Sequence, residues 1–259
     1  MTRPASPDQL DAQPAAQPAA TPHSAGPGDR PAVLVTGANR GIGRAVAEEL
    51  AADHHLILAG RDADALAALA AALPSAETFV AELTDYEGTA AAVAALELPT
   101  GLAGLVHSAG ILVNGSVEEL SAAEWERNFA VNVTAVSELT RLLLPALRTA
   151  RGTVVAVNSG SGFNAKGERG AYSASKFALR AWTNALRQEE TGHGVRVSAV
   201  HPGRVDTDMQ HELRAAESGA YESEKYLRPA TVAAAIGFAL RAPAEAVVAT
   251  IDLRPRAIG

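Results

Sequence analysis

The stretch "AVLVTGANRGIG" (residues 32–43) decides the fold of this sequence. A β-branched, apolar run leads straight into Gly37, Gly41 and Gly43, and a helical pattern follows at 41–52. In a strand–turn–helix unit, the first glycine permits a sharp turn, the second admits a phosphate group, and the third allows the helix to pack closely on the strand. The N–H groups and dipole of the helix then face an anion. The stretch therefore predicts a dinucleotide-binding turn, and its simpler interpretation is a glycine-rich turn without a ligand.

The alternation of strand and helix continues along the chain. Apolar runs, several of them nearly continuous as in strands buried on both faces, lie at 32–37, 55–60, 77–83, 102–110, 152–160, 195–203 and 246–253. Segments with helical spacing lie at 41–52, 62–73, 85–96, 121–149, 171–191 and 229–241. These patterns predict an α/β protein with a doubly wound Rossmann fold, a seven-stranded, mostly parallel sheet and helices on both faces. We expect the long helix to bend near Pro145 and Asp62 to cap the second helix.

Composition excludes several kinds of site. The chain has 259 residues, 47% of them hydrophobic, and a formal net charge of -7. It has no cysteine, which excludes disulfides and thiolate metal sites, and its histidines do not cluster with acids at metal-ligand spacing. No region has the basic character of a nucleic-acid surface, and no apolar run reaches the roughly 18 residues that span a membrane. We expect a cytoplasmic protein without a metal, nucleic-acid or membrane partner.

The N-terminal segment differs from the rest of the chain. Residues 1–30 are rich in Pro, Ala and Gln and have almost no large apolar side chains, so they cannot offset the entropy lost on ordering. We therefore predict a disordered Pro/Ala-rich tail at 1–30 and a single Rossmann-type domain at 31–259.

The spacing of the glycine turn, T-G-x-x-x-G-x-G, resembles the cofactor fingerprint of the short-chain dehydrogenase/reductase family. Matching motifs extend the resemblance over about residues 31–253. It implies an oxidoreductase that binds a nicotinamide cofactor through the turn residues Gly37, Asn39, Arg40, Gly41, Ile42 and Gly43.

Two arginines favour NADP(H) as that cofactor. After the second predicted strand, Gly60 and Arg61 stand where NAD-binding members of the family carry an acid. A guanidinium binds a 2′-phosphate through two hydrogen bonds, whereas a carboxylate repels it. Arg40 places a second cation near the same ribose.

Three further segments are similar to cofactor-binding segments of the family. Residues 82–85 resemble its adenine-side segment, 107–110 its N-N-A-G pattern, and 201–209 the segment that closes over the nicotinamide. These likenesses imply cofactor contacts from Glu82, Leu83, Ser108, Ala109, Gly110, Pro202, Gly203, Val205 and Thr207. His107, which replaces the first Asn of the pattern, is expected to be structural rather than catalytic.

Four polar residues match the family's catalytic tetrad in type, order and spacing. They are Asn132, Ser159, Tyr172 and Lys176, with Ser161 as a possible substitute for Ser159. Hydride transfer to a carbonyl creates an alkoxide, so a proton donor is needed as the charge develops. A phenol is a suitable donor, and an ammonium one helical turn away favours its ionised form in the reverse direction. Without the other motifs, the same pair would be an ordinary helix face.

The resemblance also implies a role for each member. Tyr172 is the general acid/base, and Lys176 activates it and binds the nicotinamide ribose, which makes both of them cofactor contacts as well. Ser159 holds the carbonyl oxygen, and Asn132 positions a water beside the lysine. Ser173 and Ser175 are expected only to allow close helix packing.

The predicted function is hydride transfer between NADP(H) and a small-molecule carbonyl or alcohol substrate. The alternative is a non-catalytic NADP(H)-binding regulator on the same fold. Residues 208–228 are expected to cover the substrate, and Phe163, Asn164, Lys166 and Tyr221 are candidates to line its pocket. A homodimer or homotetramer is expected, although the chain ends without the D-G-G tail of many tetrameric members.

Overall fold

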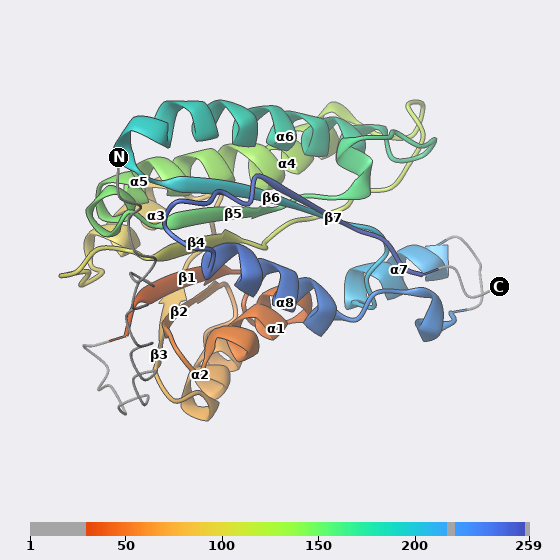
Figure 1. The fold of residues 1–259 in the computed structure, drawn as a ribbon. Coiled ribbons are helices and arrows are strands. Elements are labelled where there is room, and N and C mark those ends of the chain that lie inside the picture. Colours follow the sequence, from red (N-terminus) through yellow and green to blue (C-terminus); the bar gives the residue numbers. More distant parts are fainter. Residues whose placement is uncertain (1–29, 217–220, 257–259) are drawn as a thin grey trace, which may run out of the picture.

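The computed structural model describes residues 30–216 and 221–256, in which seven strands form one sheet (Figure 1). The strands are β1 (Ala32–Thr36), β2 (His55–Gly60), β3 (Ala76–Val80), β4 (Gly104–His107), β5 (Thr153–Val157), β6 (Arg196–Pro202) and β7 (Thr250–Leu253). Their order is β3-β2-β1-β4-β5-β6-β7, and every neighbouring pair is parallel. This confirms the doubly wound sheet. The direction of the strand order reverses between β1 and β4, which is where such folds bind ligands.

Helices cover both faces of the sheet, as predicted (Figure 1). One face carries α1 (Gly41–Leu50), α2 (Ala63–Ala72) and α8 (Pro229–Leu240), and the other carries α3 (Tyr86–Ala94), α4 (Ala122–Phe129), α5 (Ala135–Ala150) and α6 (Gly170–Glu190). A further helix, α7 (Asp208–Ala216), follows the carboxyl end of β6. The predicted tail at 1–30 falls, apart from Arg30, outside the described residues, as does part of the predicted cover at 208–228.

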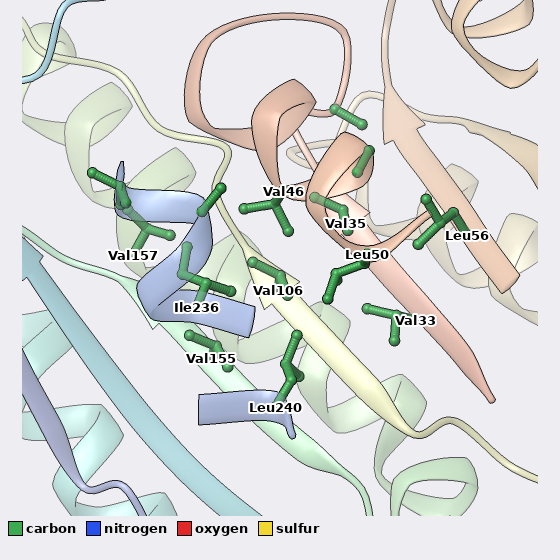
Figure 2. Packing of buried hydrophobic residues seen from close by; sticks show 14 of the residues in the cluster. Val33, Val35, Val46, Leu50, Leu56, Val106, Val155, Val157, Ile236 and Leu240 are labelled. Carbon is green, nitrogen blue, oxygen red and sulfur yellow. The ribbon is translucent and has the colours of Figure 1, made fainter. Parts of the chain in front are cut away.

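The strands β1 to β6 each contribute side chains to two apolar clusters, one on each face of the sheet, whereas β7 contributes only to the cluster under α1 and α8. In β1, Val33 and Val35 join the cluster under α1 and α8, whereas Leu34 joins the cluster under α5 (Figure 2). Because both faces are buried, polar residues cannot alternate with apolar ones along the central strands. This explains why the strands read as nearly continuous apolar runs in the sequence.

The long helix at 121–149 departs from the prediction. It is interrupted at Ala130–Thr134 by one turn of π-helix, whereas the helix continues through Pro145 as part of α5. The π-helical turn, which the sequence did not reveal, therefore contains Asn132, and Pro145 lies within the α-helical part. Single π-helical turns inside α-helices are frequent at functional sites.

The combined helical stretch Ala122–Ala150 is also long and apolar enough, by length and composition alone, to cross a membrane. Its apolar face is occupied within the fold, because Leu139, Leu143 and Leu147 are buried in the cluster on the sheet. Packing against the sheet therefore accounts for the apolar character of this helix.

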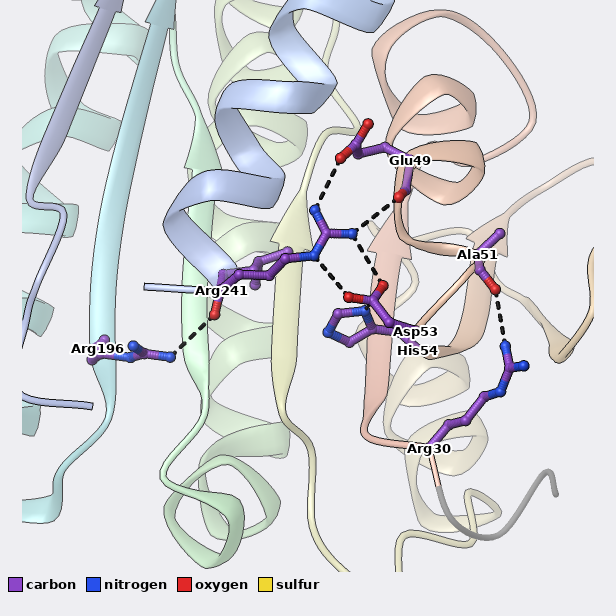
Figure 3. A network of polar contacts seen from close by, with 8 residues as sticks. Arg30, Glu49, Ala51, Asp53, His54, Arg196 and Arg241 are labelled. Atoms are coloured by element: carbon purple, nitrogen blue, oxygen red, sulfur yellow. Dashed lines mark hydrogen bonds and ion pairs between the residues drawn. The ribbon is translucent and has the colours of Figure 1, made fainter. Parts of the chain in front are cut away.

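An ion-pair network joins the ends of α1 and α8 (Figure 3). The Arg241 guanidinium donates to both carboxylate oxygens of Asp53, at 2.8 and 3.0 Å, and to the side chain of Glu49 at 2.9 Å. His54 contacts the same Asp53 carboxylate at 2.7 Å. Arg196, from β6, donates to the backbone carbonyl of Ala242 just beyond α8. These contacts hold the two helices on the same face of the sheet.

The network predicts an acid-dependent part of the stability. The Arg241 guanidinium holds the pKa of Asp53 below its ordinary value of 3.8, and His54 acts in the same direction. The stabilisation is therefore present above that value and is lost as the pH falls through the depressed pKa. Because the pair is partly exposed, Asp53→Asn should lower the free energy of unfolding at pH 7 by no more than about 1 kcal/mol.

Urea unfolding measured across the acid range checks this expectation. The wild type and the Asp53→Asn variant should differ at neutral pH and converge in acid. Glu189→Gln, which neutralises an exposed carboxylate on α6, is the control for net charge. A difference between wild type and Asp53→Asn that persists at low pH would contradict the assignment.

Candidate active site

The turn between β1 and α1 can be built only with glycine at its key positions. Gly37 and Gly41 have φ of 66° and 55°, in the left-handed region that side chains disfavour. A Cβ on Gly43 would lie 2.2 Å from the carbonyl oxygen of Gly37, so no side chain fits there. A Cβ on Gly37 would lie 3.1 Å from the backbone of Ala109. The three glycines thus bring the start of α1 close to the ends of β1 and β4.

The N-terminus of α1 is open toward this turn. Arg40, at its N-cap, makes no side-chain hydrogen bond to the helix, and the first turn contains no acidic residue. In contrast, Asp62, Asp85 and Ser121 cap α2, α3 and α4 through side-chain oxygens, which confirms the predicted cap at Asp62. First-turn N–H groups without a capping side chain, at the positive end of a helix dipole, fit the phosphates of a dinucleotide.

Thr36 ties the end of β1 to the loop after β4. Its hydroxyl oxygen accepts hydrogen bonds from the backbone N–H groups of Ser108 and Ala109, both at 3.0 Å. Next in this loop, a Cβ on Gly110 would lie 3.2 Å from the side-chain oxygen of Asn132. The predicted cofactor segment 108–110 therefore lies between the glycine turn and the predicted tetrad.

His107 is part of the core, as the sequence predicts. It is buried, its Nε2 lies 2.8 Å from the Thr140 hydroxyl, and its ring meets Trp182 edge-on. Burial lowers the pKa of His107 to about 3, so the ring is neutral at physiological pH. A neutral histidine bonded inside the core has a structural role.

The two arginines predicted to bind the adenosine half of the cofactor each form an ion pair with a carboxylate. Arg61 contacts the Glu82 carboxylate at 3.2 Å, and Arg40 contacts Asp208 at 3.4 Å. Partial burial opposes ionisation of Glu82, but hydrogen bonds from Thr84 and the Arg61 contact hold its pKa below the ordinary value. Asp208 is a partner that the sequence did not reveal, because it lies at the start of α7. Leu83 is partly buried against the cluster under α5, and Asn39 and Ile42 lie in and just after the glycine turn.

Three of the four predicted catalytic residues face one pocket of about 330 Å³ at the carboxyl ends of β4, β5 and β6. Ser159 follows β5, whereas Tyr172 and Lys176 stand one turn apart near the start of α6. Ser159 and Tyr172 both line this pocket, and the Ser159 side chain is close enough to the phenol to oppose the rise in its pKa. The Lys176 ammonium lies 5.8 Å from the centre of the Tyr172 ring and donates to the Val157 carbonyl at 3.1 Å. This matches the sequence spacing, and it favours Ser159 over Ser161 as the serine beside the tyrosine.

Burial sets the protonation of the tyrosine and the lysine. Tyr172 is 8% exposed and Lys176 is 5% exposed. Burial raises the pKa of Tyr172, while the Ser159 hydrogen bond and the positive charge of Arg169 oppose that rise. Burial lowers the pKa of Lys176 to about 8, so the ammonium form still dominates at neutral pH. The site therefore holds a protonated phenol next to a buried cation.

Asn132 braces the site from the π-helical turn. Its side-chain oxygen accepts from the backbone N–H of Ile111, and its side-chain nitrogen donates to the Ile111 carbonyl, both at 2.9 Å. The same nitrogen donates to the Ser175 hydroxyl at 3.0 Å, and that hydroxyl donates to the Tyr172 carbonyl at 2.7 Å. Ser175 is therefore more than a small residue that allows close packing, because it links Asn132 to the helix that carries the tyrosine.

Asn158 is a second residue that the sequence analysis missed. It is buried, its side chain donates to the Lys176 carbonyl at 3.1 Å, and its oxygen accepts from the Ser159 backbone at 2.8 Å. It therefore fixes the serine loop against the helix of the lysine. Its position directly before the serine was the only available signal, since the contact itself joins residues far apart in the sequence.

The segment after β6 closes the other side of the pocket. Its members Pro202, Gly203, Val205 and Thr207 all line the pocket, as do the predicted cofactor residues Ile42, Ser108 and Gly110. Thr207 also reaches the glycine turn, because a Cβ on Gly41 would lie 3.4 Å from its methyl group. The two predicted cofactor segments therefore face each other across the pocket.

The candidates for the substrate side divide into two groups. Asn164 and Lys166 line the pocket. Phe163 instead packs on the ring of His201, and Tyr221 stacks between His211 and Tyr226. The segments around 110–117, 160–170 and 204–228, which the sequence indicates as sources of pocket residues, contribute Leu112, Arg169, Arg204, Met209, Gln210 and Leu213 to the lining, whereas Arg254 was not anticipated.

Comparisons with known sequences agree with this geometry. The profile of the family described as short chain dehydrogenase matches residues 31–218. An uncharacterised oxidoreductase of Staphylococcus saprophyticus is 32% identical over 230 residues, which cover 86% of this chain and 96% of that protein. The glycine betaine reductase ATRR of Emericella nidulans is 34% identical over 249 residues, and the match spans 91% of this chain but 19% of that protein.

Solved structures share the fold over most of the chain. An alcohol dehydrogenase from Thermococcus sibiricus, complexed with 5-hydroxy-NADP, superimposes with a TM-score of 0.79 at 26% identity and covers 88% of this chain and 97% of its own. A variant of the actinorhodin polyketide ketoreductase with NADPH gives a TM-score of 0.80 at 26% identity, again over 88% and 97% of the two chains. Both contain a nicotinamide dinucleotide or a derivative of one.

The two buried serines of α6, Ser173 and Ser175, provide a matched test of the hydrogen bonds that link Asn132 to this helix. Ser175→Ala removes the hydroxyl that joins Asn132 to the Tyr172 carbonyl and should lower the free energy of unfolding by about 1–2 kcal/mol. Ser173→Ala should be neutral or slightly stabilising, since the Ser173 hydroxyl is buried and makes no hydrogen bond to any described residue. Urea unfolding measures both, and equal effects of the two substitutions would contradict the linking role of Ser175.

Proposed function

Because the chain belongs to the short-chain dehydrogenase family, whose members are oxidoreductases, we propose that it transfers hydride between NADP(H) and a small-molecule carbonyl or alcohol. The observation that carries this proposal is the Tyr172 phenol, which lines one pocket together with Ser159 and has the buried Lys176 ammonium close to its ring. This arrangement places a proton donor, a second hydroxyl and a cation around one point. A carbonyl oxygen that becomes an alcohol needs all three.

The residues around the glycine turn fit the cofactor. The open N-terminus of α1 and the left-handed glycines suit the pyrophosphate, and Ser108, Ala109 and Gly110 border the adjoining ribose position. Pro202, Gly203, Val205 and Thr207 would enclose the nicotinamide end, with Glu82 and Leu83 on the adenine side. When bound, the nicotinamide supplies the hydride in reduction or accepts it in oxidation.

In the reductive direction, Tyr172 donates its phenolic proton to the substrate oxygen while the carbonyl carbon gains the hydride. Ser159 orients that oxygen through its own hydroxyl. Lys176 has three N–H donors, of which one reaches the Val157 carbonyl, so the others can serve the cofactor ribose. Its positive charge also stabilises the phenolate that forms on Tyr172. Asn132 assists by holding the loop at Ile111 and the helix of the tyrosine in one arrangement.

The preference for NADP(H) rests on Arg61 and Arg40. Both side chains are exposed and pair with single carboxylates, Glu82 and Asp208. Exposed pairs of this kind contribute less than about 1 kcal/mol, so a 2′-phosphate with two hydrogen bonds per guanidinium can displace them.

We further propose that the protein is a cytoplasmic homodimer or homotetramer whose domain spans residues 31–259. Phe177 on α6 and Phe238 on α8 are exposed at 38% and 65%. Apolar side chains of this size on the outer faces of helices are suited to contact with further copies of the chain.

Replacement of Tyr172 by phenylalanine tests the catalytic assignment. It removes only the hydroxyl, so kcat for reduction of a responsive carbonyl should fall by about 10²–10⁴-fold. The Kd for NADPH, measured by fluorescence, should stay unchanged because the ring remains in place. Turnover that survives the substitution would contradict the role of Tyr172. Wild-type protein that binds NADPH but oxidises it with no compound of a broad carbonyl panel would favour the non-catalytic regulator.

Charge reversal at Arg61 tests the cofactor preference. Arg61→Asp should shift the ratio of kcat/KM for NADPH over NADH toward NADH by at least about tenfold, because the carboxylate repels the 2′-phosphate. Arg127→Asp, at an exposed position of α4, is the control for net charge. If the ratio of kcat/KM for NADPH over NADH is unchanged in Arg61→Asp, the assignment of Arg61 to the 2′-phosphate is wrong.

A further inference from the structure

The pocket in front of Tyr172 has a charge opposite to that of the protein. The chain carries a formal net charge of -7. Yet the pocket is lined by five basic residues, which are Lys166, Arg169, Lys176, Arg204 and Arg254. Among the lining residues that the structure describes there is no aspartate or glutamate. Such a concentration of positive charge in one concave site raises the local concentration of anions.

Four of these five basic residues come from three loops at the carboxyl ends of neighbouring strands, and the fifth, Lys176, lies on α6. Lys166 and Arg169 lie between β5 and α6, Arg204 follows β6, and Arg254 follows β7. The arginines proposed for the cofactor 2′-phosphate, Arg40 and Arg61, do not line this pocket. The pocket therefore has a basic cluster that is distinct from those two arginines and lines the same cavity as the Tyr172 phenol.

Two of the five basic residues already have a defined task. Lys176 donates to the Val157 carbonyl and lies beside the Tyr172 ring. Arg254 pairs with Asp252 and donates to the His201 carbonyl at 2.8 Å. Of the remaining three, Lys166 is exposed, whereas Arg169 and Arg204 are half-buried. After Lys176, the two arginines are thus the cations of the pocket best shielded from bulk water.

The backbones of both arginines are anchored. The Arg169 carbonyl accepts from the Ser173 N–H at 2.8 Å, and the Glu168 carbonyl before it accepts from the Gly115 N–H at 2.7 Å. The Arg204 carbonyl accepts from the Leu227 N–H at 2.9 Å. Both residues also have further interactions within the chain. Arg169 is close enough to the phenol for its charge to oppose the rise in the pKa of Tyr172.

We propose that the substrate carries an anionic group, a carboxylate or a phosphate, which Arg169 and Arg204 bind while its carbonyl or alcohol carbon faces Tyr172. This inference rests on the proposed function and narrows its substrate class. Planar guanidinium groups match carboxylate and phosphate oxygens in pairs of hydrogen bonds, and those bonds strengthen where water is partly excluded. An uncharged substrate of the same shape would cover these cations without neutralising them, at a desolvation cost.

The test compares substrates that differ only in charge. Oxo acids of increasing chain length are paired with their methyl esters, and a keto phosphate is paired with the dephosphorylated ketone. The wild type should prefer the charged member of at least one pair by about 10–100-fold in kcat/KM, the effect of one or two charge-assisted hydrogen bonds. Comparison of the two kinds of pair identifies the carboxylate or the phosphate as the group recognised.

Variants then assign the recognition to the two arginines. Arg169→Gln and Arg204→Gln should each reduce the preference for the anion by about tenfold or more, and Arg169→Lys should retain part of it. Arg127→Gln on α4 is the control and should keep the wild-type preference. The ratio of acid to ester separates anion binding from any effect of Arg169 on Tyr172, since an altered phenol would slow both members of a pair equally.

Binding measurements separate this inference from the proposed function. Calorimetry with the NADPH-bound wild type and the Tyr172→Phe variant compares acid with ester without requiring turnover. Tight, arginine-dependent binding of acids without turnover would support the anion site and overturn the enzymatic proposal. If neutral ketones are turned over at least as fast as their charged partners, the enzymatic proposal stands and the anion site is overturned. An Arg204→Gln variant that weakens NADPH binding but keeps the preference for acids would show that Arg204 binds the cofactor, and it would overturn the assignment of Arg204 to the anion site.

Discussion

The close contact inside the glycine turn is the constraint on which the rest of the site depends. The start of α1 lies so near the end of β1 that a Cβ at Gly43 would be 2.2 Å from the Gly37 carbonyl oxygen. This proximity brings the open end of the helix dipole to the carboxyl edge of the sheet. The Thr36 hydroxyl then draws the loop after β4 to the same edge through two N–H groups. The crevice between these loops follows from backbone geometry, before any catalytic side chain is considered.

The catalytic side of the crevice depends on a different balance, the burial of polar groups against hydrogen bonds that satisfy them. Burial raises the pKa of Tyr172 and lowers that of Lys176, so each group is disfavoured in its charged form. Ordered partners offset part of that cost, namely the Val157 carbonyl for the lysine and Ser159 for the phenol. Asn132 and Asn158 keep those partners in register with α6. A network of this kind favours one geometry, because a shifted member would leave a buried polar atom without a partner.

Sequence reasoning reached the fold because local patterns along the chain encode it, and local spacing also predicted that Tyr172 and Lys176 share one helix near Ser159. Continuous apolar runs identified strands buried on both faces, and the spacing of Tyr172 and Lys176 identified one helix face. It failed where a tertiary contact decides the outcome. The π-helical turn at Asn132 was not predicted, and Ser175 bonds to a residue 43 positions away in the chain. The pairing of Arg61 with Glu82 joins two predicted cofactor ligands, and no pattern of either segment alone indicates it.

The exposed pairs of Arg61 with Glu82 and Arg40 with Asp208 show how a phosphate-binding site can be stable both without its phosphate and with it. A phosphate-binding arginine without a neighbouring carboxylate would attract any anion in solution. An exposed carboxylate at 3.2 or 3.4 Å holds each guanidinium near its place without much energy, since solvent and salt screen the pair. A phosphate carries more charge and accepts two hydrogen bonds from one guanidinium, so it outcompetes the carboxylate. Weak, exposed pairs are therefore compatible with a site selective for the 2′-phosphate, whereas strong, buried pairs would oppose it.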